Sequence, residues 1–360
     1  MTPPVRDLAG IPPALRRSGR RRTLQTVEDE WINARMGLRL YGIAAAIIIA
    51  AAGSACEPDA RTSAAAAIDV SADENAWRID RRADIETFLD CLEENGLSIV
   101  SAHRGGPGRG RPENSLEAIS ATLAAAPALI EFDVATSADG VLFLMHDDTL
   151  DRTTTGAGAY ADKTWADIEK IRLVDADGQT GPSAPPTFAD ALKLVTERTF
   201  AQIDFKRSTR YEDVIAEVRR QGAEGRVILI AYSTAQARRL NQLAPEMKIS
   251  ASMENPSRLD EILAAGLETD SVVAFAGIDD VDPSLNATLD ARDVEVIFGT
   301  LGGPRSIDNA IARTGDDDRY AEISRAGVDV IATDRPVAAH RALVKAGRAP
   351  QAGVCGLVAP

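Results

Sequence analysis

The sequence predicts an α/β fold, a TIM-like barrel of eight parallel strands with a small insertion that holds a hairpin strand after barrel strand two. Three observations predict it. Short apolar runs rich in β-branched residues alternate with helical patterns through most of the chain. One of the nine runs follows its predecessor too closely for a parallel crossover, so it must fold back. The remaining eight runs match the strand number of a closed β/α barrel.

The apolar runs are expected to form strands, because β-branched residues fit a pleated surface that is buried on both faces. They occupy residues 97–102, 128–134, 141–146, 200–205, 227–231, 248–252, 272–276, 294–299 and 328–333. Helices are expected between most of them, at residues 115–125, 187–196, 211–221, 234–243, 257–265 and 307–325.

The run 141–146 is the surplus strand. Asp139-Gly140 is a typical two-residue hairpin turn, and that turn pairs Asp133 with His146 across the hairpin. Residues 135–186 then form an insertion between barrel strand two and the helix that begins near residue 187.

The first 56 residues are expected to be a targeting region. Residues 1–35 are rich in Pro and Arg and lack periodicity, so we expect either a disordered extension or a non-translated one, and the start codon is Met1 or Met36 accordingly. Residues 36–56 have the basic start, apolar centre and small-residue end of a signal peptide. The end, Gly53-Ser54-Ala55-Cys56, resembles a bacterial lipobox, although Gly53 stands where Leu is usual.

The sequence therefore predicts an exported protein, periplasmic or held at a membrane as a lipoprotein through Cys56. Ordinary cleavage after Ala55 and an uncleaved anchor are the alternatives. Residues 57–75 are expected to be a tether, residues 76–350 the barrel, and residues 351–360 a C-terminal tail. Cys91 and Cys355 lie near the two ends of the barrel, and they either form a disulfide or stay unpaired.

The charge pattern argues against a nucleic-acid-binding protein. The formal net charge is −14, and no basic cluster appears outside the first 35 residues. An acidic chain suits a site that binds a cation through carboxylates, although acidic surfaces are common without one.

Carboxylates are expected to gather at one end of the barrel. Side chains alternate along a strand, so Glu131 and Asp133 share a face, which is expected to be the inner one. Asp204 and Lys206 share a face of the next barrel strand. Oxygen ligands of this kind suit Ca²⁺ or Mg²⁺, and Lys206 is placed to neutralise a phosphate oxygen. The alternative is an ion-paired cluster with only a structural role.

Two histidines are expected at the same end of the barrel. His103 closes the first barrel strand and is followed by Arg104, whose guanidinium suits a phosphate. The predicted hairpin brings His146 beside the acidic pair. The third histidine, His340, is expected to be exposed on the terminal helix.

These residues form a pattern that resembles the glycerophosphodiester phosphodiesterase family. The motifs run from about residue 97 to 340: His103-Arg104-Gly105, Pro112-Glu113-Asn114-Ser115, Glu131-Phe132-Asp133-Val134, Asp139-Gly140, His146-Asp147, Leu150-Asp151-Arg152-Thr153-Thr154, Asp204-Phe205-Lys206 and Thr333-Asp334-Arg335-Pro336.

The resemblance implies hydrolysis of a glycerophosphodiester to glycerol 3-phosphate and an alcohol. It implies one divalent cation, Ca²⁺ or Mg²⁺, on Glu131, Asp133 and Asp204. It also implies that His103 and His146 are the acid and base. Arg104 and Lys206 would bind the phosphate of this small-molecule substrate.

The chain departs from the family pattern in two places. Asp204 stands where the family usually has Glu, and Phe298-Gly299-Thr300-Leu301 replaces a usual Trp-Thr-Val-Asn. The substrate pocket is therefore expected to differ. A phospholipase of the C or D type acting on intact phospholipids, and a non-catalytic surface-binding lipoprotein, are the competing functions.

Overall fold

The computed structural model describes residues 75–360. The expected extension, signal peptide, lipidated Cys56 and all but the last residue of the tether lie outside the described residues.

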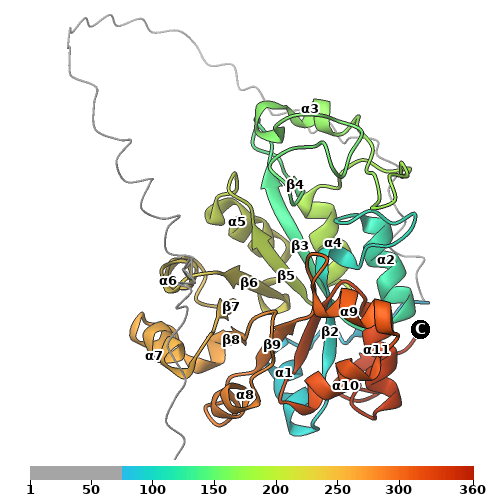
Figure 1. The fold of residues 1–360 in the computed structure, drawn as a ribbon. Coiled ribbons are helices and arrows are strands. Elements are labelled where there is room, and N and C mark those ends of the chain that lie inside the picture. Colours follow the sequence, from blue (N-terminus) through green and yellow to red (C-terminus); the bar gives the residue numbers. More distant parts are fainter. Residues whose placement is uncertain (1–74) are drawn as a thin grey trace, which may run out of the picture. The chain divides into compact units, whose positions relative to one another are not determined.

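Eight parallel strands close into a barrel, as the sequence predicted (Figure 1). Each strand pairs with the next in the order β2, β3, β5, β6, β7, β8, β9, β10, and β10 pairs with β2 to close the ring. The strands are β2 (Ile99–Ala102), β3 (Ala128–Thr136), β5 (Ala201–Phe205), β6 (Val227–Ala231), β7 (Lys248–Ser252), β8 (Val272–Phe275), β9 (Val296–Gly299) and β10 (Val330–Thr333).

Most helices follow the barrel strands and cover them, whereas α1 precedes β2 and α3 lies in the insertion. They are α1 (Ile85–Glu94), α2 (Leu116–Ala125), α3 (Trp165–Ile168), α4 (Phe188–Thr196), α5 (Tyr211–Gln221), α6 (Thr234–Leu243), α7 (Pro256–Ala264), α8 (Pro283–Asp290), α9 (Ile307–Thr314), α10 (Asp318–Arg325) and α11 (Pro336–Lys345). The single helix expected at 307–325 is wrong, because Gly315 adopts a left-handed conformation (φ 73°) and ends α9.

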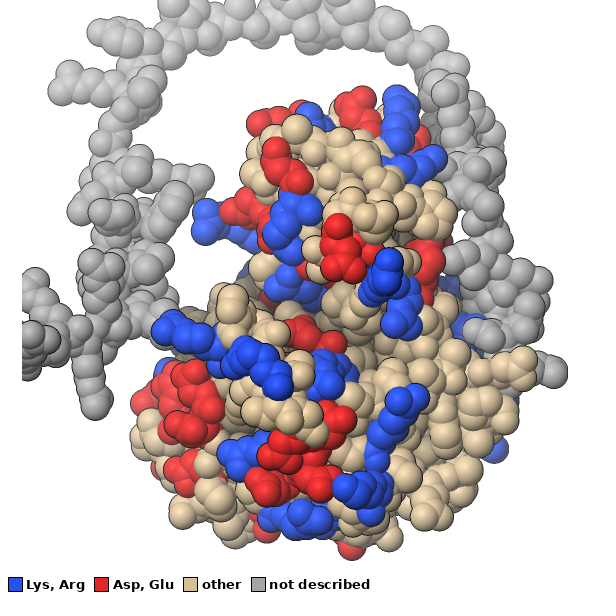
Figure 2. All heavy atoms as spheres, turned by 45° about the vertical axis from the view of Figure 1, so that its right-hand side comes forward, with Lys and Arg blue, Asp and Glu red and all other residues tan. Residues whose placement is uncertain are grey.

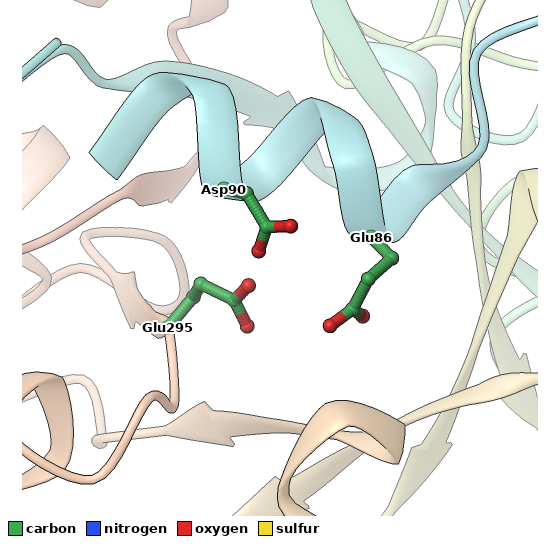
Figure 3. Close-up of side chains that lie close together, drawn as sticks. All are labelled: Glu86, Asp90 and Glu295. Atoms are coloured by element: carbon green, nitrogen blue, oxygen red, sulfur yellow. The ribbon is translucent and has the colours of Figure 1, made fainter. Parts of the chain in front are cut away.

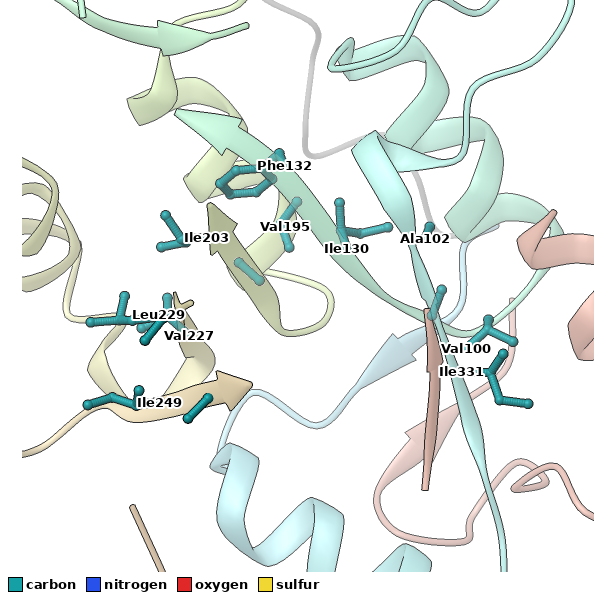
Figure 4. Close-up of a cluster of buried hydrophobic side chains, with 14 of the residues drawn as sticks. Val100, Ala102, Ile130, Phe132, Val195, Ile203, Val227, Leu229, Ile249 and Ile331 are labelled. Carbon is teal, nitrogen blue, oxygen red and sulfur yellow. The ribbon is translucent and has the colours of Figure 1, made fainter. Parts of the chain in front are cut away.

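The main core lies between the barrel and its helices. Alternate strand residues such as Ile130, Phe132, Ile203 and Leu229 are fully buried there, against apolar helix residues such as Val195 (Figure 4). The other residues of each strand face the barrel interior. This alternation places Glu131 and Asp133 inside the barrel.

The helix α1 closes the barrel at the end where the strands begin. Its buried residues Ile85, Phe88, Leu89 and Leu92 join the first inward residues of the strands in one apolar cluster. The strand β1 (Arg78–Ile79) pairs with β11 (Leu357–Val358) beside this cluster. The segment expected as a C-terminal tail therefore contributes a strand to this end of the barrel.

Cys91 and Cys355 form a disulfide, which the sequence had left open. The bond joins α1 to the segment before β11 and has a Cα–Cα distance of 5.6 Å. It therefore links the two ends of the described chain.

The surplus strand β4 (Leu142–Leu144) pairs antiparallel with β3 outside the barrel, as predicted, but its register differs by one residue. Val134 lies opposite Leu144, and the amide of Met145 donates to the carbonyl of Asp133. The turn has three residues rather than two, and its last residue, Gly140, has φ 88°. The predicted pairing of Asp133 with His146 is therefore wrong.

Acidic and basic side chains are interspersed on the face of the domain seen in Figure 2. A search of residues 75–360 for a helix with the length and apolar character of a membrane span found none.

Candidate active site

Three carboxylates meet inside the barrel near the carboxyl ends of two neighbouring strands. Glu131 and Asp133 come from β3, and Asp204 lies beside Asp133 on β5. One oxygen of each can be chosen so that all three lie within 4.8 Å of one another. Their exposed fractions are 8%, 1% and 6%. Three buried carboxylates at this separation repel one another unless positive charge compensates them.

Lys206 supplies part of that charge. Its Nζ lies 2.6 Å from Oδ1 of Asp133 and 2.7 Å from Oδ2 of Asp204. The other oxygen of Asp204, Oδ1, is buried and accepts no hydrogen bond from the described part of the chain. An unsatisfied carboxylate oxygen inside an acidic cluster fits a divalent cation, which prefers oxygen ligands.

Burial and charge separate the pKa values of the three acids. Burial and the neighbouring Asp133 raise the pKa of Glu131 well above its usual range. Burial also raises the pKa of Asp204, although Lys206 opposes it. Burial would raise the pKa of Asp133 too, but Lys206 and Arg104 outweigh burial and hold it below its usual range. Glu131 and Asp204 therefore ionise less readily than usual unless a further positive charge lies beside them, as a bound cation would.

The loop after β2 supports this cluster. Asn114 donates from Nδ2 to Asp133 (2.7 Å) and accepts from the Asp133 amide (3.1 Å). Arg104 adopts a left-handed backbone conformation (φ 51°), in which its amide donates to Oε2 of Glu131 (2.7 Å). A residue with a side chain rarely adopts this conformation, and such strain gathers at functional sites.

His103 stands at the end of β2 and is held by Asp334. The His103 Nδ1 lies 2.6 Å from Oδ1 of Asp334, which follows β10. Arg104 donates from Nε to the His103 Nε2 at 3.3 Å, so Nδ1 carries the proton that Asp334 accepts. Although burial alone would lower it, the pKa of His103 is raised by the hydrogen bond that the ring donates to Asp334 and by the charge of Glu131.

His146 stands just after β4, where the chain bends out of the strand. Its Nδ1 lies 2.7 Å from Oδ1 of the adjacent Asp147. The His146 ring also helps to lower the pKa of Asp133, after the larger effects of Lys206 and Arg104. Both histidines therefore lie beside the same acidic cluster. In each ring Nδ1 faces an aspartate, so Nε2 is the nitrogen on the side of the ring away from that aspartate.

The structure thus brings together all seven predicted site residues, but it gives the two cations more partners than expected. Arg104 donates from Nη1 to Glu113 at 2.8 Å, while Lys206 bridges two aspartates. His340 is the exception among the histidines. It is only 9% exposed and packs against Trp77, so the expectation of an exposed side chain is wrong.

Four supporting residues escaped the sequence analysis: Glu113, Asn114, Asp147 and Asp334. Each belongs to a motif that carries the family resemblance, but a motif does not show which atom a side chain contacts. Asp147 offered the clearest signal, because it directly follows His146.

A second acidic cluster lies at the opposite end of the barrel. Glu86 and Asp90 of α1 and Glu295 before β9 turn their carboxylates toward one another (Figure 3). Lys248 makes an ion pair with Glu86 and lies 3.2 Å from Oε2 of Glu295. Asp90 is exposed, Lys248 pairs with the other two acids, and none of the three belongs to a motif of the family resemblance, so we assign no metal ion to this cluster.

Comparison with known proteins gives one consistent result. The model of the glycerophosphoryl diester phosphodiesterase family matches residues 103–338. A glycerophosphodiester phosphodiesterase from Caldanaerobacter subterraneus is 30% identical over 162 residues, which cover 42% of this chain and 65% of that protein. Glycerophosphodiester phosphodiesterase 1 from Bos taurus is 46% identical over 83 residues, which cover 23% of this chain and 25% of that protein. This chain thus spans less than two thirds of the length of either relative.

Solved structures show the same fold. A glycerophosphoryl diester phosphodiesterase from Parabacteroides distasonis has a TM-score of 0.69 and 25% identity, and the match covers 79% of this chain and all of that chain. A phosphodiesterase from Oleispira antarctica, solved with the product sn-glycerol-3-phosphate, has a TM-score of 0.54 and 18% identity. That match covers 70% of this chain and 98% of that chain, and it supports the fold alone.

Proposed function

The chain belongs to the glycerophosphoryl diester phosphodiesterase family, and from this premise we propose that it hydrolyses glycerophosphodiesters to glycerol 3-phosphate and an alcohol. One observation carries the proposal: three buried carboxylates and two carboxylate-bound histidines stand together at the carboxyl end of the barrel. Catalytic groups of β/α barrels gather at this end.

Glu131, Asp133 and Asp204 would hold one divalent cation, Ca²⁺ or Mg²⁺. The unsatisfied Oδ1 of Asp204 and the excess of buried acid support this assignment. When bound, such a cation stabilises the negative charge that grows on the non-bridging phosphate oxygens.

His103 and His146 would act as the acid and base. Each ring donates from Nδ1 to an aspartate, so Nε2 of the neutral ring is the nitrogen that takes a proton. The proton comes from an attacking water, or from a glycerol hydroxyl whose attack forms a cyclic phosphate that water then opens. In His103, Nε2 would first release the hydrogen bond that Arg104 now donates to it. The protonated ring on the other side returns a proton to the departing alcohol. The raised pKa of His103 favours this ring as the proton donor, and its protonation would displace the hydrogen bond that Arg104 now donates to Nε2.

Arg104 and Lys206 would bind the phosphate. Arg104 already lies between the histidine and the acids, with Nε 3.5 Å from Oδ2 of Asp133. Both side chains are mostly buried, at 16% and 14% exposed, so they would meet a phosphate with little competing water. Substrate binding would require both cations to share their hydrogen bonds with the carboxylates they now contact.

Export of the protein, with a tether through Cys56, is part of the proposal. The disulfide between Cys91 and Cys355 supports it, because such bonds persist in oxidising compartments outside the cytoplasm. Intact-mass analysis of the protein from its native host would test it: a diacylglyceryl group on Cys56 is expected, and an unmodified Cys56 contradicts the tether.

The central test is a side-by-side assay. Purified protein is given glycerophosphocholine, glycerophosphoethanolamine and vesicles of intact phosphatidylcholine, each after chelation and after addition of Ca²⁺, Mg²⁺ or Mn²⁺. We expect release of glycerol 3-phosphate from the first two, loss of activity on chelation and recovery with one of the cations. His103→Ala and His146→Ala should lower kcat by about 10²- to 10⁴-fold without unfolding the protein.

Other outcomes distinguish the alternatives. Faster cleavage of intact lipid would assign a phospholipase activity to the same barrel. Absence of turnover on every diester would favour the non-catalytic binding protein. Activity that survives chelation would remove the cation from the proposal, and unchanged turnover in both histidine variants would remove the two rings from it.

A further inference from the structure

Arg152 lies between two carboxylates that no part of the proposed chemistry uses directly. It belongs to the insertion, after β4. Its Nε and Nη2 donate to the two oxygens of Asp147 at 2.6 and 2.8 Å. Its Nη1 and Nη2 donate to the two oxygens of Glu113 at 2.7 and 2.8 Å. One guanidinium therefore makes a paired contact with two carboxylates, one from the insertion and one from the loop after β2.

Each carboxylate in turn holds a residue of the proposed site. Asp147 Oδ1, which accepts from Arg152, also faces the Nδ1 of His146 at 2.7 Å. Glu113 Oε1, which also accepts from Arg152, accepts from Nη1 of Arg104 at 2.8 Å. A continuous chain of hydrogen bonds thus runs from the ring of one proposed acid or base to the guanidinium of one proposed phosphate ligand. Nη2 of Arg152 joins the two halves of this series, because it donates both to Asp147 and to Glu113.

This series of hydrogen bonds fixes the orientation of the side chains more than it adds to the unfolding free energy. Arg152 is 48% exposed, so solvent weakens its ion pairs, but a planar guanidinium holds two carboxylates at defined angles. Hydrogen bonds from Arg152 are the main cause that lowers the pKa of Asp147, and they also help to lower the pKa of the more buried Glu113. Both acids therefore stay ionised as acceptors around neutral pH.

We propose that Arg152 is a positioning residue that fixes the Nδ1–H tautomer of His146 through Asp147 and the orientation of Arg104 through Glu113. The insertion carries His146 and the loop after β2 carries Arg104, so this contact joins the two halves of the site through side chains that touch both residues. The inference rests on the proposed function for its kinetic consequence, but not for its structural one.

Histidine NMR tests the structural consequence without any assay of activity. The chain has only three histidines, so ¹⁵N-histidine labelling gives three pairs of ring-nitrogen signals. The pair that is missing in a His146→Gln variant belongs to His146. In the unaltered protein the neutral ring of His146 should be in the Nδ1–H form. Arg152→Ala should move it toward the Nε2–H form, while the buried ring of His340 keeps its shifts.

Kinetics tests the functional consequence. Arg152→Ala should lower kcat through His146 and raise KM through Arg104, each by about 10- to 100-fold, the usual range for residues that orient catalytic groups. Arg152→Lys keeps the charge but loses the paired contacts, so it should recover only part of the loss. In a protein that already carries Asp147→Asn, the effect of Arg152→Ala on kcat should largely disappear, because both changes break the same chain.

The control is Arg172→Ala, which removes an exposed arginine of the same insertion whose Nη1 donates to the carbonyl of Ile171. It should change neither the tautomer nor the kinetics. An unchanged His146 tautomer in folded Arg152→Ala or Arg152→Lys protein overturns the inference. If the unaltered protein cleaves no diester, the proposed function fails instead, and the NMR result still decides the role of Arg152.

Discussion

Removing the charge of Lys206 should convert the apo protein into one that depends on a cation for stability. The ammonium now neutralises Asp133 and Asp204, which are 1% and 6% exposed. In Lys206→Met, a side chain of similar length fills the space without the charge. Asp133 keeps two partners, Asn114 and Arg104, whose Nε lies 3.5 Å from its Oδ2. Asp204 loses the ion pair that holds its Oδ2.

The size of the loss follows from the burial of this group. Removing one partner of a buried ion pair costs about 3–5 kcal/mol of unfolding free energy. Protonation of Asp204 limits the loss, because burial already raises its pKa. We therefore expect about 3 kcal/mol, which lowers Tm by about 5 °C in a domain of this size. A cation at one hundred times its Kd returns about 2.7 kcal/mol, so most of the loss should disappear.

The assay is thermal unfolding followed by circular dichroism, with chelator and with Ca²⁺ or Mg²⁺. Lys193→Met, which alters an exposed lysine of α4, is the matched control and should change Tm little under either condition. An equal Tm for Lys206→Met and the unaltered protein in chelator would refute the electrostatic argument. A lower Tm that no divalent cation restores would show that the three acids do not form a cation site.

Three further predictions follow from other parts of the structure. Asp334→Asn should lower kcat by about 10²- to 10⁴-fold with little change in KM, because His103 loses the acceptor that fixes its tautomer; steady-state kinetics beside a circular dichroism spectrum checks this. Burial lowers the pKa of His340 to about 4, below the value near 6.5 expected in the unfolded chain. The contribution of the neutral ring to the unfolding free energy, about 3 kcal/mol, is therefore complete above pH 6.5 and is lost as the pH falls toward 4. The unfolding free energy measured in urea at pH 7 and at pH 5 should differ less for His340→Leu than for the unaltered protein. The disulfide closes a loop of 264 residues, so Cys91→Ser with Cys355→Ser should lower the unfolding free energy by at most about 5–6 kcal/mol, and an unchanged urea midpoint would contradict that role.

The architecture was readable from the sequence because the barrel repeats one simple pattern. Each strand must be apolar on the face toward its helices. Apolar residues such as Ile130, Phe132 and Ile203 identify that face from the sequence of the strand alone. The same alternation placed Glu131 and Asp133 inside. Period and spacing are local properties, so a single sequence carries them.

The hairpin register was not readable in the same way. A Gly at residue 140 is equally suited to the second position of a two-residue turn and to the left-handed position of a three-residue turn. The structure adopts the second, which slides the pairing by one residue. His146 still stands near Asp133, because the chain leaves the strand before it, and Asp147 then holds the ring.

The support of the site depends on contacts between distant parts of the chain, and these have no local signal. Asp334 reaches His103 across 231 residues, and Glu113 reaches Arg152 across 39. His340 was expected to be exposed because its helix position alone does not reveal Trp77 packed against it. Such contacts depend on how the ring of strands closes, which the sequence pattern does not specify at the level of atoms.

Helix α1 closes the end of the barrel where the strands begin, and this limits the path by which a small molecule can reach the interior. Phe88, Leu89 and Leu92 fill that opening with apolar side chains that are at most 1% exposed, so a charged phosphate ester has no passage there. In the proposed reaction the diester and its products would therefore reach and leave the acidic cluster from the end where the strands finish. Glycerol 3-phosphate formed in that reaction would leave by the path that the next diester must enter, so added glycerol 3-phosphate should inhibit the proposed hydrolysis competitively.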